Sequence, residues 1–369
     1  MPSILRIKQQ KHLIIRRYAK ADNAKALAES LATLVPLALI WWAAVLSVSI
    51  SRWLTAAIVL LLTLFTIRVL VMMHDCGHGS LFRTRRFNHA FGFLFGVLSG
   101  MPQYVWSRHH DYHHANNGNW EKFRGPLTTP SVDEYSAMSV ARQRLYRYTR
   151  SILLAPFGGF VYLIFNPRFT WLKGSIGLLI HVVKSQLAQP GVSMKQHAAG
   201  YKSQYWKSAK EYRHMLWNNV ALLSTWTLMC WAVGAGLFFA IYVSSLSLAG
   251  GAGIALFTVQ HNFEHSYAAG SAEWDYDTGT IMGTSFLILP HWLNWFTANI
   301  GYHHIHHLSA RIPSYRLADC QNENRDLFAG VARVKLSQIH SALKYILWDT
   351  RAQRIISVAE YRDLYEVVR

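Results

Sequence analysis

The sequence has few charged residues and few cysteines. Only 15% of its 369 residues are Asp, Glu, Lys or Arg, against about 25% in an average soluble domain, which excludes a disordered chain or a coiled coil. The three cysteines are far apart and form no CxxC pair. This excludes a disulfide framework, a zinc ribbon and an iron–sulfur centre of the chain's own. No repeat, proline-rich linker or low-complexity tract divides the chain, so a single domain over residues 1-369 is expected.

Acidic residues are scarcest among the charged ones. The chain has 19 Asp and Glu against 37 Lys and Arg, which gives a formal net charge of +18. In a soluble protein such an excess would indicate nucleic-acid binding. Here 51% of the residues are hydrophobic and they form long runs, so we predict membrane lipids as partners and no nucleic acid.

Four apolar runs have the length of a membrane-spanning helix, since about 20 residues cross a hydrocarbon core of roughly 30 Å. They cover residues 31-50, 53-73, 220-241 and 245-260. We therefore predict an all-α integral membrane protein with four transmembrane helices in two hairpins. Other apolar runs are shorter and are predicted to be interfacial or re-entrant. These cover residues 91-101, 152-165, 176-183 and 281-290.

The distribution of positive charge predicts the orientation in the membrane. Two hairpins place both termini and the long segments 74-216 and 261-369 on the same side. All Lys and Arg except Arg52 and Arg68 then lie on that side, which the positive-inside rule makes cytoplasmic. We expect a multi-pass membrane protein whose termini and helical cap are cytoplasmic.

Histidine is the abundant polar residue, and its positions are clustered. Twelve of the 19 histidines fall in windows 74–78, 109–114, 261–265 and 303–307. The first window is HxxxH, and the second and fourth each contain HxxHH, spacings that place the histidines on one face of a helix. The third window offers His261, with His265 as a further candidate. The same-face histidines are His74 and His78, then His110, His113 and His114, then His303, His306 and His307.

So many imidazoles indicate a metal centre with more than one ion. Eight or nine ligands exceed what one ion holds, and zinc sites use three or four. The Glu and Glu-x-x-His pattern of soluble di-iron bundles is absent. A histidine-rich dinuclear iron site at the bilayer edge, activating O2 against a C–H bond, remains the favoured interpretation. His109 and His304 point away from the ligand face in this arrangement.

These motifs resemble those of the membrane-bound fatty acid desaturases. The resemblance rests on HDCGHGS at 74–80, HxxHH at 110–114, Gln260-His261 and NIGYHHIHHL at 299–308, and it covers about residues 30-325. It implies two iron ions on the cytoplasmic side, O2 as co-substrate, and insertion of a cis double bond into an acyl-lipid or other fatty-acyl substrate. The ligands it implies are His74, His78, His110, His113, His114, His261, His303, His306 and His307.

The first and last boxes look most like those of the acyl-lipid Δ12 (ω6) branch. In the acyl-CoA branch an Asn one helical turn before the third-box histidine reaches a metal through water, whereas this chain has Phe257 there. Asn262, Asn299 and His265 stay open as alternatives. The chain has no fused cytochrome b5 domain, clustered Cys or GxGxxG motif after a strand. A separate electron donor of ferredoxin or cytochrome b5 type is therefore expected.

Two other functions fit parts of the same pattern. A membrane di-iron hydroxylase, ketolase or alkane monooxygenase would use the same ligands, because one metal centre can either add oxygen to carbon or remove a second hydrogen. A membrane metal carrier would also need histidines, but carriers place ligands through the bilayer, and none of the windows lies in the middle of a predicted span. An apolar passage for the acyl chain is expected beside residues 91-101 and 281-290.

Overall fold

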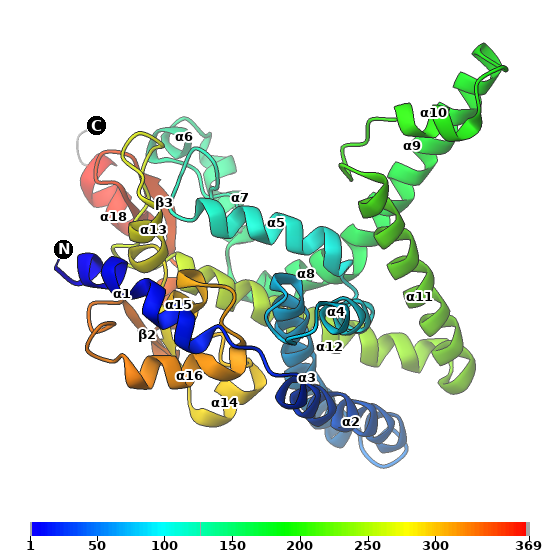
Figure 1. Cartoon of the computed structure of the whole chain (residues 1–369), viewed down its shortest axis with the longest axis horizontal. Helices are drawn as coiled ribbons and strands as arrows, with labels where there is room; N and C mark the ends of the chain where they lie inside the picture. Colours follow the sequence, from blue (N-terminus) through cyan, green and yellow to red (C-terminus); the bar gives the residue numbers. More distant parts are fainter. Residues whose placement is uncertain (1, 126, 367–369) are drawn as a thin grey trace.

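The protein is mostly helical, and its computed structural model describes residues 2–125 and 127–366 (Figure 1). The first part of the chain forms α1 (Pro2–Tyr18), α2 (Asn23–Ser47), α3 (Arg52–His78), α4 (Arg85–Leu98) and α5 (Gln103–Asn116). The middle forms α6 (Val132–Ser136), α7 (Val140–Thr149), η1 (Ile152–Leu154), α8 (Ala155–Gly159), the π-helix η2 (Phe160–Phe165), α9 (Asn166–Ala188), α10 (Met194–Gly200), α11 (Ala209–Val233) and α12 (Ala235–His261).

The last part of the chain mixes short helices with short strands. It contains α13 (Tyr276–Met282), β1 (Phe286–Ile288), α14 (His291–Phe296), α15 (His303–Leu308), α16 (Ser314–Glu323), β2 (Arg333–Lys335), η3 (Leu336–Gln338), α17 (Ile339–Ala342), β3 (Tyr345–Asp349), β4 (Arg354–Ser357), α18 (Val358–Tyr361) and η4 (Arg362–Glu366). In Figure 1 this part gathers with α1 at one end of the molecule, and α9, α10 and α11 extend from the other.

Four helical stretches in the described chain are long and apolar enough to cross a membrane: α2, α3, the run Ile152–Ala188, and α12. Their number agrees with the prediction. The predicted runs 31-50, 53-73 and 245-260 lie within α2, α3 and α12, apart from the last three residues of the first run. The arrangement in two hairpins stays a prediction.

The predicted third span was placed incorrectly. Residues 220-241 contain the end of α11, a break at Gly234 with φ +85°, and the start of α12. Hydropathy does not mark this break, because the sequence is apolar on both sides of it. The small residues 249–253 (AGGAG) lie inside α12, where a Cβ on Gly250 would be 2.7 Å from the Cα of Gly159. They allow α8 to approach closely.

Two segments predicted to be too short to span belong to one helical run. η1, α8, η2 and α9 follow one another without a gap between Ile152 and Ala188. Arg168 does not interrupt the run, because its guanidinium donates to Asn219 Oδ1 at 2.8 Å and to the carbonyl oxygens of Leu163 (3.2 Å) and Gly100 (2.5 Å). A charged residue each of whose guanidinium nitrogens has a hydrogen-bond partner is compatible with an apolar helix.

The all-α prediction holds for most of the described chain, which also contains four short strands. β1 pairs with β2 in parallel, and β3 pairs with β4 in antiparallel orientation. The apolar run 281-290, predicted to be interfacial or re-entrant, contributes the end of α13 and β1. A three-residue strand within an apolar run has no visible alternation, and its partner lies more than 40 residues away, so the sequence pattern does not reveal it.

The helices that carry the histidine boxes pack on two apolar cores. Met72, Met73 and Cys76 of α3 contact a cluster that includes Phe82 and Phe95. A second cluster joins α15 to its neighbours: it contains Ile305 and Leu308 of α15, Leu317 and Cys320 of α16, and Ile7 and Ile14 of α1. The first cluster also contains Leu246 of α12, so it joins box-carrying helices from both halves of the chain.

Candidate metal centre

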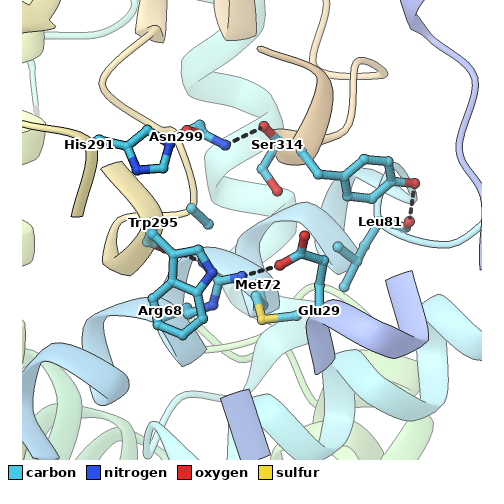
Figure 2. A pocket seen from close by; sticks show the side chains of 10 residues that line it. Glu29, Arg68, Met72, Leu81, His291, Trp295, Asn299 and Ser314 are labelled. Atoms are coloured by element: carbon cyan, nitrogen blue, oxygen red, sulfur yellow. Dashed lines mark hydrogen bonds and ion pairs between the residues drawn. The ribbon is translucent and has the colours of Figure 1, made fainter. Parts of the chain in front are cut away.

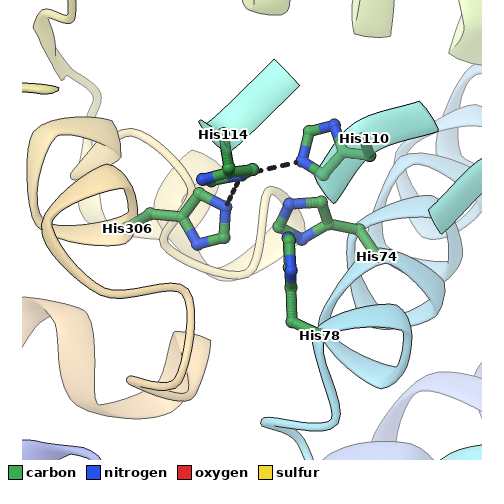
Figure 3. Close-up of side chains that lie close together, drawn as sticks. All are labelled: His74, His78, His110, His114 and His306. Carbon is green, nitrogen blue, oxygen red and sulfur yellow. Dashed lines mark hydrogen bonds between the residues drawn. The ribbon is translucent and has the colours of Figure 1, made fainter. Parts of the chain in front are cut away.

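The nine histidines implied as ligands lie together in two adjacent groups, supplied by α3, α5, α12 and α15. Within each group, one ring nitrogen of every histidine lies within 4.8 Å of the others. The five-histidine group, shown in Figure 3, is His74, His78, His110, His114 and His306. The four-histidine group is His113, His261, His303 and His307.

The nitrogen separations suit ligands of a common metal ion. In the five-histidine group the Nε2 atom of His114 is 3.0 Å from Nε2 of His110 and 3.0 Å from Nε2 of His306. Two ligands about 2.1 Å from one ion at a right angle are about 3.0 Å apart. A neutral imidazole nitrogen has either one proton or one lone pair, so hydrogen bonding alone does not satisfy three converging Nε2 atoms well.

The four-histidine group has the same spacing. Nε2 of His303 is 2.9 Å from Nε2 of His261, and Nε2 of His113 is 3.2 Å from Nε2 of His307. The ring of His307 stacks on the ring of His114 from the other group, with centroids 4.1 Å apart. The two groups are therefore neighbours, as a dinuclear site requires.

The surroundings of one nitrogen atom indicate whether a metal ion fits the five-histidine group. Nε2 of His78 is buried and has no hydrogen-bond partner among the described residues. Burying a polar atom without a partner costs free energy. A metal ion held by the group would accept this lone pair, so the residues present fit a metal site.

Burial keeps these histidines neutral. It lowers the pKa of the six grouped histidines on α5 and α15 (His110, His113, His114, His303, His306 and His307) well below the ordinary value, and the neighbouring imidazoles lower it further. A neutral imidazole has the free lone pair that a metal ligand needs, whereas a protonated one does not. The site is thus prepared to bind a cation near neutral pH.

The comparison with known proteins identifies the family. Residues 51–337 match the family model described as "Fatty acid desaturase". The chain belongs to this family. As a fatty acid desaturase it is an oxidoreductase.

Individual relatives agree with this assignment. A fatty acid desaturase of Bacillus subtilis is 30% identical over 344 residues, covering 93% of this chain and 88% of that protein. An endoplasmic-reticulum omega-3 desaturase of tobacco is 24% identical over 266 residues, and a chloroplastic omega-6 desaturase of spinach is 22% identical over 249 residues. The alignments cover 59% and 48% of those two plant enzymes. Since both omega-3 and omega-6 enzymes match, the comparison does not decide the double-bond position.

Three oxygen acceptors face the Nδ1 atoms of box histidines in this desaturase. They were not predicted from the sequence. Nδ1 of His74 lies 3.1 Å from Oδ1 of Asp75, Nδ1 of His78 lies 3.3 Å from Oδ1 of Asp111, and Nδ1 of His261 lies 3.2 Å from the carbonyl oxygen of residue 283. Such partners fix the ring orientation and tautomer of a ligating histidine. Both carboxylates are next to a box histidine in the sequence, which is a signal that could have found them.

Asp75 also connects the desaturase's metal centre to a distant segment. Its side chain is buried, and its Oδ2 accepts the backbone N–H of Ser314 at 2.9 Å. The carboxylate of Asp75 is therefore hydrogen-bonded through one oxygen to His74 of α3 and through the other to Ser314, the first residue of α16.

The two extra box histidines lie outside both groups, as expected. His109 is exposed. His304 is buried, and its Nε2 donates to Oε1 of Gln321 at 2.8 Å, with its ring against Phe328. His304 is therefore part of the packing between α15 and α16.

The three residues left open as alternatives have other contacts or are exposed. The amide of Asn262 donates to the carbonyl oxygen of Tyr345 at 3.1 Å, and the amide of Asn299 donates to that of Ser314 at 3.2 Å. His265 has a side chain that is 73% exposed.

Phe257 occupies the position that an Asn has in the acyl-CoA branch. Its ring lies edge-on to His113 and His261, with centroids 5.0 Å apart in both cases. Phe257 therefore gives the four-histidine group an apolar wall.

A polar cavity of about 100 Å³ is lined by Ser314, the residue whose N–H Asp75 accepts, and by Arg68 and Glu29 (Figure 2). Arg68 is 3% exposed in its wall, forms an ion pair with Glu29, and donates to the carbonyl oxygen of Trp295. Charged walls and a small volume do not suit an acyl chain. Gly96, in the run 91-101, packs closely against backbone, since a Cβ there would be 2.6 Å from the carbonyl oxygen of Met101. The apolar passage stays a prediction.

Proposed function

We propose that the protein is an O2-dependent acyl-lipid desaturase that inserts a cis double bond at the Δ12 (ω6) position. In this proposal two iron ions are held by the nine histidines, one by each group. The observation that supports it most directly is that all nine histidines converge, five and four, from four separate helices. The Δ12 (ω6) position rests on the form of the first and last histidine boxes.

The overall reaction removes two hydrogens from neighbouring methylenes and reduces O2 to two waters, which requires two further electrons and two protons. Bound iron would supply the redox chemistry for O2 and the C–H bond. The chain's own contribution is to hold neutral imidazoles in place and to exclude water. Eight of the nine histidines are buried, and the ring of Phe257 packs against the four-histidine group, which limits side reactions of an oxidant.

The electrons come from a separate protein in this proposal. The three cysteines are unpaired and distant in sequence, so the chain has no thiolate set for an iron–sulfur cluster. A ferredoxin or a cytochrome b5 type protein fits the need for single-electron transfer. The basic cytoplasmic surface expected from the charge distribution would attract an acidic donor.

The proposed location is an integral, multi-pass membrane protein whose termini and histidine boxes face the cytoplasm. Three of the four candidate spanning helices contain predicted spans. Two of these, α3 and α12, end at His78 and His261. Ligands at the ends of spans would place the metal centre at the membrane edge, where an acyl chain of a lipid can reach it.

The product profile tests the proposal. The chain is expressed in cells that contain saturated and monounsaturated acyl lipids, and their fatty acids are analysed by gas chromatography and mass spectrometry. We expect a new cis double bond at Δ12, absent with the His306→Ala variant. A double bond at another position would overturn the regiospecificity. A hydroxylated or ketonic product would favour the related oxygenases, and no change in any lipid would contradict the desaturase proposal.

A further inference from the structure

A long part of the chain lacks acidic residues, and the metal centre does not use it. Between Glu134 and Glu211 there is no Asp or Glu, but there are eleven lysines and arginines. α7 lies at the start of this segment, and the candidate spanning run Ile152–Ala188 follows it after two residues. The segment therefore carries unbalanced positive charge directly beside an apolar helix.

One face of α7 attaches it to the rest of the protein. The guanidinium of Arg147 donates to the hydroxyl of Tyr135 at 2.9 Å, and the hydroxyl of Tyr146 donates to the carbonyl oxygen of Ile346 at 2.7 Å. The amide of Gln143 donates to the carbonyl oxygen of Tyr135 at 2.9 Å. These bonds define which face of α7 points outward.

The outward face combines free arginines with exposed apolar side chains. The side chains of Arg142 and Arg144 are exposed and make no hydrogen bond or ion pair with any described residue. Val140 is 65% exposed, Leu145 60% and Tyr148 63%. Residues four apart are neighbours on a helix, so Arg144 lies on the same side of α7 as Val140 and Tyr148.

The apolar surface continues beyond α7 toward the candidate span. Leu153 of η1 is 85% exposed and Phe157 of α8 is 65% exposed. A membrane surface fits this combination: its phosphates accept bidentate hydrogen bonds from arginine, and its acyl boundary receives aliphatic and aromatic side chains. A soluble acidic protein would pair with the arginines but would leave this adjoining apolar surface in water.

We propose that this α7 surface, formed by Val140, Arg142, Arg144, Leu145, Tyr148 and Leu153, binds anionic phospholipid at the membrane interface. Arg142 and Arg144 are two residues apart and so lie on opposite flanks of the outward face; each binds a head-group phosphate, and the apolar residues between them contact the upper acyl chain. The site is independent of the desaturation reaction, and its lipid need not be the substrate.

The test measures lipid binding directly. Purified full-length protein in neutral detergent is titrated with fluorescent phosphatidylglycerol, and separately with the same probe on phosphatidylcholine. Each arginine near an anionic lipid contributes about fivefold in affinity, so Arg142→Gln with Arg144→Gln is expected to weaken phosphatidylglycerol binding by up to about 25-fold. Binding of phosphatidylcholine is expected to change little.

Matched variants separate this site from a general charge effect. Replacing the same arginines by Lys keeps the charge and should retain most of the binding. Replacing the exposed Arg311 and Lys344 by Gln removes the same charge elsewhere and should leave the affinity unchanged. Leu153→Ser should weaken binding of both probes. Iron content, measured for every variant, reports whether the fold is intact.

Three outcomes would overturn the proposal. The first is an equal loss of phosphatidylglycerol binding in the Arg311 and Lys344 control. The second is unchanged binding after both α7 arginines are replaced in protein that retains its iron. The third is unchanged lipid binding together with slower reduction by an acidic electron donor, which would assign the α7 surface to the donor instead.

Discussion

Replacing Asp75 by Asn should weaken metal binding without changing the shape of the site. Oδ1 of Asp75 accepts a hydrogen bond from the Nδ1–H of His74 at 3.1 Å, and Oδ2 accepts one from the backbone N–H of Ser314 at 2.9 Å. An amide has only one oxygen, so one of these two N–H groups would face an NH2 group. Asp75 is 2% exposed, so water does not readily replace the lost acceptor.

The expected magnitude follows from the role of such partners. Removing a hydrogen-bond partner of a ligating histidine costs about 10–100-fold in metal affinity, which corresponds to about 1.4–2.8 kcal/mol. The assay is the rate of iron loss from purified protein to a chelator, followed by absorbance. Asp75→Ala, which removes both acceptors, should lose iron at least as fast as Asp75→Asn.

Asp111 provides the matched control. It lies 3.3 Å from Nδ1 of His78, but its side chain is 60% exposed, so water can take its place and Asp111→Asn should have the smaller effect. If Asp75→Asn keeps iron as well as the native protein, or Asp111→Asn loses it faster, the carboxylate of Asp75 does not orient His74 as argued here.

Four further outcomes are expected. His306→Ala and His303→Ala each remove a ligand from a different group, so each should lower the iron content of purified protein, and unchanged content in either would contradict the ligand assignment. Gly159→Leu should lower the melting temperature in detergent, since a Cβ there would lie 2.3 Å from a carbonyl oxygen of α12, and overpacking costs about 1–3 kcal/mol. Arg68→Ala should destabilise the protein by about 3–5 kcal/mol, because it leaves Glu29 without its buried partner. The double variant Glu29→Gln with Arg68→Met should recover part of this loss of stability. The metal-free protein should lose thermal stability as the pH falls below about 6.5. The histidines of the unfolded chain take up protons there, whereas the buried histidines of α5 and α15 do not, because their pKa values are lowered. A melting temperature that does not change with pH would refute this.

The sequence determined much of the site, because spacing on a single helix is a local property. HxxxH and HxxHH place their histidines on one face at any position in a fold. Resemblance to the desaturases then indicated which nine histidines to expect, and all nine lie in the two groups. The positions of His109 and His304 away from the ligand face followed from the same helical geometry.

The sequence did not determine where one apolar helix ends and the next begins. The break at Gly234 lies in a sequence that is apolar on both sides, and the glycines at 250 and 251, which lie inside α12, allow close packing between α8 and α12. The pairing of β1 with β2 joins segments more than 40 residues apart. Each of these features depends on contacts between distant segments.

The division of the histidines between the two groups was decided by tertiary structure alone. Both HxxHH boxes are split: His113 joins a different group from His110 and His114, and His306 a different group from His303 and His307. The local pattern is the same for the members of each box, because they share one helical face. Which metal position each ring reaches depends on how α5 and α15 pack against the ends of α3 and α12, and only the folded chain provides those neighbours.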